Sequence, residues 1–254
     1  MDRQQYLSPR SPYTTLEIPS QGMGDWCVPL MTATIEDNGL RSIITEDGFF
    51  DTGLGLRFRL PKEGQNVLYT SLWDNFPNSL TIPVSKERID AGSSNRAAAT
   101  NYSCAYLLLA GSTNNMQSRL DNGLVVANYS DGSADTLHLT NPYNWCPIEQ
   151  DYYYDDHAYW SASQHPYRVH LGSGKVSRNL KQDLQETGQD NGAVNIHVTD
   201  FEADTPIAKG LSIPNGAAQL LKMPLDSNRQ LESLTVCTLS NDVVIGLMAV
   251  TFEQ

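Results

Sequence analysis

The side chains best suited to ligand binding are concentrated in residues 141–160, which read NPYNWCPIEQDYYYDDHAYW. A pyranose ring has apolar C–H faces that stack on Trp or Tyr, and its hydroxyls are bound by carboxylate and amide side chains. The stretch therefore predicts a carbohydrate-binding surface. In that interpretation Trp145, Tyr152 and Trp160 supply the stacking rings, while Glu149 and Asp151 bind hydroxyl groups. The alternative is a loop that packs over the edge of a sheet and uses these rings as a small core of its own.

A second polar and aromatic cluster occurs at Leu72–Pro77, directly after an apolar run. An exposed Trp beside Asp and Asn at the end of a strand is a plausible ligand platform. We therefore add Trp73, Asp74 and Asn75 to the predicted ligand-binding residues. A buried Trp73 whose indole N–H binds the backbone is the competing interpretation.

Two carboxylates near each other also suit acid and base catalysis. Glu149 and Asp151, or Asp74, are candidates for the pair in a glycoside hydrolase or lyase, which requires carboxyl groups about 5–5.5 Å or about 6.5–9.5 Å apart. The chain contains no G-x-S-x-G, H-E-x-x-H, Walker or G-x-G-x-x-G motif, and these absences argue against the corresponding enzyme classes. We assign no catalytic residue and favour a non-catalytic role for this chain.

Metal and cofactor signals are weak. Asp151, Asp155 and Asp156 offer oxygen ligands for a structural Ca²⁺, but their spacing is not that of an EF-hand. The four cysteines are scattered and form no C-x-x-C pair, so a zinc ribbon or thioredoxin motif is absent. The sequence predicts no cofactor.

The composition narrows the choice of partners. Of 254 residues, 17 are basic and 29 are acidic, which gives a net charge of −12. A nucleic-acid partner is excluded because binding to the phosphate backbone needs a basic face. No apolar run reaches the roughly 18–20 residues of a membrane-spanning helix. The N-terminal residues contain no apolar segment of the kind found in a signal peptide, so we do not expect an intact secretory precursor.

The hydrophobic pattern is that of an all-β protein. Short apolar or alternating runs are separated by turn signals such as Asp47-Gly48 and Ser130-Asp131-Gly132-Ser133, and the latter predicts a hairpin joining residues 124–129 to 134–140. Helix is expected only at Asn179–Glu186. Two polar segments, Ser85–Tyr102 and Arg178–Gly192, are predicted as surface excursions. We expect one antiparallel β-sandwich over residues 61–254, with residues 1–60 as an extension that packs on it or completes it.

Several segments resemble a family of unknown function that occurs at the C-terminal end of large bacterial proteins resembling carbohydrate-active enzymes. The resemblance extends from about Tyr13 to Phe252. It is carried by the runs TSLWDNFP, AYLLLAGSTNNMQS, NPYNW with PIEQDY, and LSNDVVIGLMAVT. It implies a sandwich of the galactose-binding, jelly-roll kind in a protein exported to the periplasm or cell surface. The pair Trp145-Cys146 departs from the family pattern, where two neighbouring aromatic residues are expected.

These observations lead to three hypotheses. The first is an accessory, non-catalytic module of a polysaccharide-degrading system, which binds carbohydrate or packs on a catalytic domain. The second is a glycoside hydrolase or lyase. The third is a purely structural interdomain or oligomerisation module, which a contiguous exposed apolar patch would favour.

Overall fold

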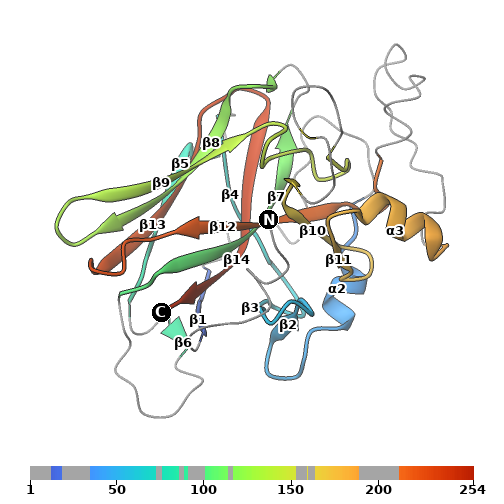
Figure 1. Ribbon diagram of the computed structural model, residues 1–254, viewed down its shortest axis with the longest axis horizontal. Helices are drawn as coiled ribbons and strands as arrows, with labels where there is room; N and C mark the ends of the chain where they lie inside the picture. Colours follow the sequence, from blue (N-terminus) through green and yellow to red (C-terminus); the bar gives the residue numbers. More distant parts are fainter. Residues whose placement is uncertain are drawn as a thin grey trace.

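The fold is an antiparallel β-sandwich with little helix, seen in a computed structural model (Figure 1). The structure describes residues 13–18, 35–72, 76–85, 89–90, 101–113, 117–152, 159, 164–188 and 212–254. The predicted all-β class is confirmed, and the sheets are not closed into a barrel. Two of the short apolar runs that indicate strands in the sequence, Ala193–Phe201 and all of Leu30–Ile35 except Ile35, lie outside the described residues.

The larger sheet contains eight strands. Their order is β11 (Val176–Ser177), β10 (Tyr167–His170), β12 (Ala217–Pro224), β7 (Cys104–Thr113), β14 (Val243–Glu253), β1 (Tyr13–Leu16) and β6 (Ile89–Asp90), and β4 (Leu68–Ser71) also pairs with β14. Every residue of β7 and nearly every residue of β14 is buried, so both faces of these strands are covered. Burial on two faces explains the unbroken apolar runs in the sequence of these strands.

The smaller sheet contains four strands and covers one face of the larger sheet. Its order is β5 (Ser79–Pro83), β13 (Leu231–Thr238), β8 (Asp121–Tyr129) and β9 (Ala134–Thr140). The predicted hairpin is confirmed: β8 and β9 pair from Asn128↔Ala134 onward, and Gly132 in the turn has φ of 83°. Buried and less buried positions alternate along β8 and β13, as expected for strands with one face in the core.

A third layer covers the other face of the larger sheet. It consists of the hairpin β2 (Phe49–Asp51) and β3 (Arg57–Arg59) and the short helix α2 (Asn38–Ser42). Phe50, Phe58 and Leu40 from this layer pack against β7 and β14. Sequence analysis did not predict α2 or β2, because both are too short to show a periodic pattern. The N-terminal region thus contributes both a strand of the larger sheet, β1, and a covering layer.

The predicted helix at residues 179–186 is confirmed as α3 (Leu180–Glu186). Leu180 and Leu184 lie four residues apart on its buried side and pack with Ile213 and Ala217. Arg178–Gly192 is therefore not only a surface excursion, because this amphipathic helix occupies its first half. Of the other predicted excursion, Ser85–Tyr102, the structure describes Ser85, the short strand β6 and residues 101–102.

A substitution at Gly111 tests how closely β7 and β14 approach each other. A Cβ atom at Gly111 would lie 1.9 Å from the carbonyl oxygen of Val244, so Gly111→Ala must displace the backbone. We expect the free energy of unfolding to fall by about 3 kcal/mol, as for severe overpacking, measured by urea denaturation. At Gly64 a Cβ meets nothing within 4 Å but φ is 73°, so Gly64→Ala should cost only about 1 kcal/mol. Equal losses for the two variants would contradict this reading of the β7–β14 contact.

Candidate functional site

The predicted ligand-binding segment lies across the end of β7, where it forms backbone hydrogen bonds to both sides. The amide of Ile148 donates to the carbonyl of Gly111 (2.8 Å), and the carbonyl of Ile148 accepts from the amide of Ala217 (2.7 Å). The carbonyl of Glu149 accepts from the amide of Ile213 (2.8 Å). Residues 147–150 are thus fixed between β7 and the chain that leads into β12.

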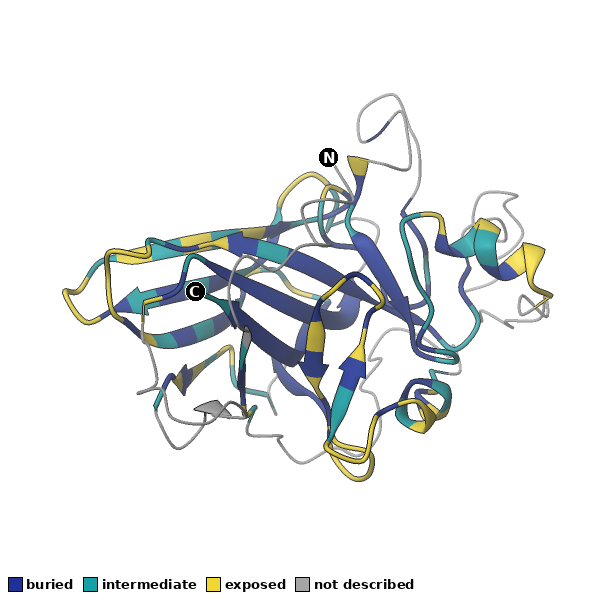
Figure 2. Cartoon of the chain, turned by 60° about the horizontal axis from the view of Figure 1, so that its bottom comes forward, coloured by how far each residue is buried: buried dark blue, intermediate teal, exposed yellow. Residues whose placement is uncertain are grey.

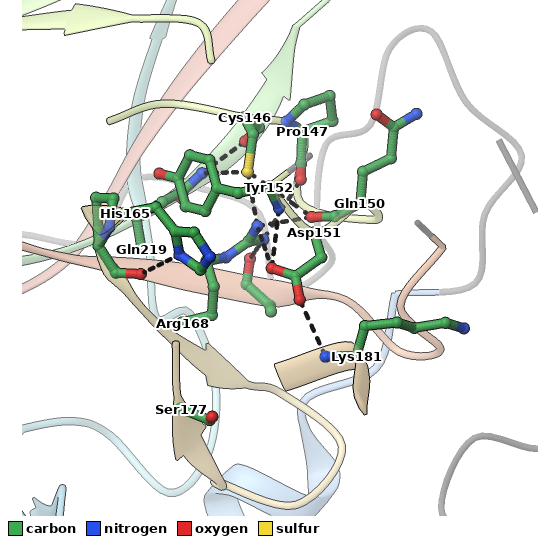
Figure 3. Close-up of polar contacts among 12 residues, drawn as sticks. Cys146, Pro147, Gln150, Asp151, Tyr152, His165, Arg168, Ser177, Lys181 and Gln219 are labelled. Carbon is green, nitrogen blue, oxygen red and sulfur yellow. Dashed lines mark hydrogen bonds and ion pairs between the residues drawn. The ribbon is translucent and has the colours of Figure 1, made fainter. Parts of the chain in front are cut away.

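Arg168 of β10 is the centre of the polar cluster beneath this segment (Figure 3). Its guanidinium is fully buried and donates to the carbonyls of Gln150 and Ala217, both at 2.6 Å, and to that of Ala218 at 3.3 Å. It also donates to the sulfur of Cys146 at 2.6 Å. A planar guanidinium presents five N–H donors in a fixed fork, and here they join the loop, β10 and β12.

Asp151 connects this cluster to α3. One carboxylate oxygen lies 3.9 Å from Nη1 of Arg168 and accepts from the amide of Tyr152 at 2.9 Å. The other accepts from the amide of Lys181 at 2.9 Å. Lys181 lies in the first turn of α3, whose N-cap residue, Asn179, makes no capping hydrogen bond with its side chain. Asp151 therefore supplies the carboxylate that a helix N-terminus favours.

The remaining members of the cluster are also buried. The side-chain amide of Gln219 donates to the carbonyl of Cys146 at 2.6 Å. Burial raises the pKa of the Cys146 thiol to about 12, so it is protonated at neutral pH and is not an activated nucleophile. The ring of Tyr152 stacks on His165 with centroids 5.1 Å apart and meets Tyr159 edge-on at 5.8 Å. Burial lowers the pKa of His165.

Glu149 differs from these residues because its carboxyl group has no hydrogen-bond partner in the part of the chain that the structure describes. Only 1 % of the residue is exposed, and neither carboxyl oxygen makes a hydrogen bond. Burial raises its pKa to about 7, and the nearby backbone amide of Glu149 itself and the positive charge of Arg168 offset that shift only in part. A buried carboxyl with a pKa near neutrality is either a general acid or a source of pH-dependent stability.

The expectation that Trp145 and Tyr152 form exposed stacking platforms is wrong. Trp145 is completely buried in the core between the two sheets, and Tyr152 is buried in a ring cluster with Cys146 and Tyr159. The reason is the large apolar area of these rings, which favours burial wherever a loop covers the end of a sheet. Glu149 and Asp151 are buried beside them, so they do not present hydroxyl-binding groups at the surface. Trp73, Asp74, Asn75 and Trp160 lie outside the described residues.

Sequence analysis missed Arg168, Gln219 and His165. Arg168 and Gln219 were overlooked because a polar residue between apolar neighbours in a strand, as in Tyr167-Arg168-Val169, looks like a solvent-facing position. His165 lies before β10, in Gln164-His165-Pro166, where no pattern marks it as buried. In the structure that face is covered by the 146–152 segment. In the part of the chain that the structure describes, no group of three or more His, Cys, Asp or Glu side chains is arranged to hold a metal ion. Asp155 and Asp156, which were considered as Ca²⁺ ligands, lie outside that part.

No model of a protein family matches this chain, and no curated protein matches it. Among the described helices, none has the length and apolar character needed to cross a membrane.

Removing the guanidinium of Arg168 should destabilise the protein strongly. Arg168→Met leaves several buried carbonyls without a donor and the buried Asp151 without its counter-charge, and we expect a loss of about 3–5 kcal/mol in the free energy of unfolding. Arg168→Lys should recover little of it, because an ammonium lacks the fork geometry. The control is Arg229→Met, at an exposed ion pair with Asp226, which should leave the urea midpoint unchanged. Full recovery by Lys would contradict a role for the fork.

Glu149 should make stability depend on pH. Its pKa is about 7 in the folded protein against a model value of 4.5, so the folded state holds the proton more tightly than the unfolded chain. The resulting stabilisation is complete below about pH 4.5 and is lost as the pH rises through 7, by about 3 kcal/mol in all. Glu149→Gln removes this loss, so its stability relative to wild type should increase between pH 5 and pH 8 in urea titrations.

The control for this pH dependence is Asp131→Asn. Hydrogen bonds from Ser133 hold the pKa of Asp131 below its usual range, so this carboxylate stays ionised from pH 5 to pH 8. The stability difference between Asp131→Asn and wild type should therefore be constant over that range. A constant difference for Glu149→Gln as well would show that Glu149 does not titrate there.

Proposed function

We propose that this chain is a non-catalytic accessory module of a polysaccharide-degrading system, located in the periplasm or outside the cell, that binds carbohydrate or packs on a catalytic domain. The non-catalytic part of the proposal is supported by the hydrogen bonds of the buried charged side chains. Arg168 donates hydrogen bonds to backbone carbonyls, and both carboxylate oxygens of Asp151 accept hydrogen bonds from backbone amides. Side chains used in this way hold the backbone in place and offer a substrate no free group.

The polysaccharide part of the proposal is supported by the resemblance of the sequence to domains found in proteins that look like carbohydrate-active enzymes. The antiparallel sandwich is compatible with a binding or packing module, although fold alone does not imply function. The buried rings of Trp145 and Tyr152 remove one version of the binding hypothesis, in which those rings stack on the sugar. Any sugar-binding surface must therefore be sought elsewhere on the sandwich.

One observation favours the enzymatic alternative. A glutamic acid with a pKa near 7 has the property expected of a general acid in a glycoside hydrolase. However, both carboxyl oxygens of Glu149 are closed to solvent, and its proposed partner Asp151 is fully engaged. A carboxyl group that a glycosidic oxygen cannot reach does not protonate it, so the non-catalytic proposal is preferred.

The proposal is tested by measuring binding and hydrolysis together. The purified chain is run through native gels containing neutral polysaccharides, and the same mixtures are assayed for new reducing ends. We expect retardation by at least one neutral polysaccharide and no release of reducing ends, for both wild type and Glu149→Gln. Release of reducing ends by wild type that Glu149→Gln abolishes would establish the enzymatic alternative instead.

A further inference from the structure

Twelve outward positions of the smaller sheet carry no charged side chain. The register places its outward side chains in three rows of four across β5, β13, β8 and β9. The rows are Pro83–Ser233–Asn128–Ala134, Thr81–Thr235–Val126–Thr136 and Ser79–Cys237–Leu124–His138. None of these twelve residues is Asp, Glu, Lys or Arg, although the chain carries a net charge of −12. Two acids lie on the central strands outside the three rows: the exposed Glu232 at the bulge in β13 and the half-buried Asp121 at the start of β8.

These side chains face away from the core. Their neighbours along the strands, such as Val125, Leu234 and Ile82, belong to the core between the two sheets, while Val126 and Leu124 do not. The positions on the edge strands β5 and β9 are exposed, and those on the central strands β8 and β13 are half-buried. Figure 2 shows these exposed and half-buried colours along the β8–β9 hairpin, at the left.

The face combines hydrogen-bonding side chains with two neighbouring apolar side chains. Asn128 donates to the hydroxyls of Ser233 (3.1 Å) and Thr235 (3.0 Å), and Thr235 is joined to Thr81 at 2.9 Å. These hydroxyls form a connected polar array, and each retains further hydrogen-bonding capacity. Val126 and Leu124 lie beside the array on β8, in adjacent rows of the register.

One end of the face carries an imidazole side chain. His138, in the third row, binds a carboxylate oxygen of Asp121 at 2.7 Å. That hydrogen bond, with a second from Thr140, holds the pKa of Asp121 below its usual range. The Asp121 charge is therefore compensated by hydrogen bonds at the margin of the face.

We propose that this face binds an uncharged, extended polysaccharide. A neutral glycan offers hydroxyls to the Ser, Thr and Asn side chains and C–H groups to Val126 and Leu124, and it needs no counter-charge. A flat sheet suits a chain lying across several strands, whereas small isolated ligands are usually held in concave pockets. The inference rests on the proposed carbohydrate-binding function and assigns it to a surface. A second copy of this chain is the competing occupant, because two uncharged faces can meet without repulsion.

The test introduces charge at the centre and edge of the face. Thr136→Glu/Thr235→Glu adds two carboxylates that a neutral ligand would have to desolvate. The matched control, Ser42→Glu/Thr187→Glu, adds the same charge at exposed positions on α2 and directly after α3. Affinity for the neutral polysaccharides that retard wild type is measured by calorimetry, with circular dichroism to establish that each variant is folded. The face variant should bind at least about tenfold more weakly, and the control should match wild type.

The outcomes separate this inference from the proposed function. If wild type binds a polysaccharide and both double variants bind it equally well, the face is wrong while carbohydrate binding stands. If wild type binds none of the polysaccharides, carbohydrate binding fails and the face assignment fails with it. Light scattering is recorded on the same samples: a wild-type dimer that the face variant alone dissociates, with polysaccharide affinity unchanged, would assign the face to a second copy. Should the face variant unfold, Thr136→Glu alone, at an exposed edge position, is used in its place and should still weaken binding.

Discussion

The arrangement of the 146–152 segment depends on the buried guanidinium of Arg168. A cation without water is costly unless its donors are satisfied, and here backbone carbonyls from the loop and from β12 satisfy them. The same constraint works in the other direction, because those carbonyls would be unpaired without the guanidinium. Asp151 adds a compensating charge and extends the connection to α3. One side chain thus orders a loop, two strands and a helix end that are far apart in the sequence.

The difference between the two sheets has an equally simple physical basis. The larger sheet is covered on one face by the smaller sheet and on the other by the β2–β3 hairpin with α2, so β7 and β14 are apolar at nearly every position. The smaller sheet is covered on one face only by described residues, and its strands alternate accordingly. Alternation alone permits Lys, Glu or Thr on the open side. The choice of small uncharged residues there is a separate property of this sequence.

Local patterns in the sequence were sufficient to predict most of the fold. The hairpin at residues 124–140 is predicted by two alternating runs on either side of Ser-Asp-Gly-Ser. The long strands are predicted by short apolar runs bounded by turn signals. Elements of two to five residues, such as β2 and α2, carry too little pattern to be recognised. The prediction of the binding site was less successful. Aromatic residues such as Trp145 and Tyr152 occur both in buried loops and in exposed ligand platforms, and the sequence does not distinguish the two. Whether such rings are buried depends on which strand lies beneath the loop, and that is a tertiary fact. Arg168 illustrates the same limit, since only the fold shows that its side of β10 is covered.

The acidic character of the chain acquires a more specific meaning from the structure. Glu149 and Asp151 are buried, the first without a hydrogen-bond partner among the described residues and the second paired with Arg168, so these two carboxyl groups lie in the interior and do not form a binding surface. The twelve outward positions of the smaller sheet, in contrast, carry no Asp or Glu. Twelve adjacent uncharged positions in a protein of net charge −12 are suited to an uncharged partner, because desolvating a carboxylate against a neutral ligand is unfavourable. Aromatic residues predict a binding site at residues 141–160, whereas the absence of charge at the twelve positions indicates the open face of β5, β13, β8 and β9. These twelve positions become neighbours only through the strand register, so the sequence alone does not show that they form one uncharged face.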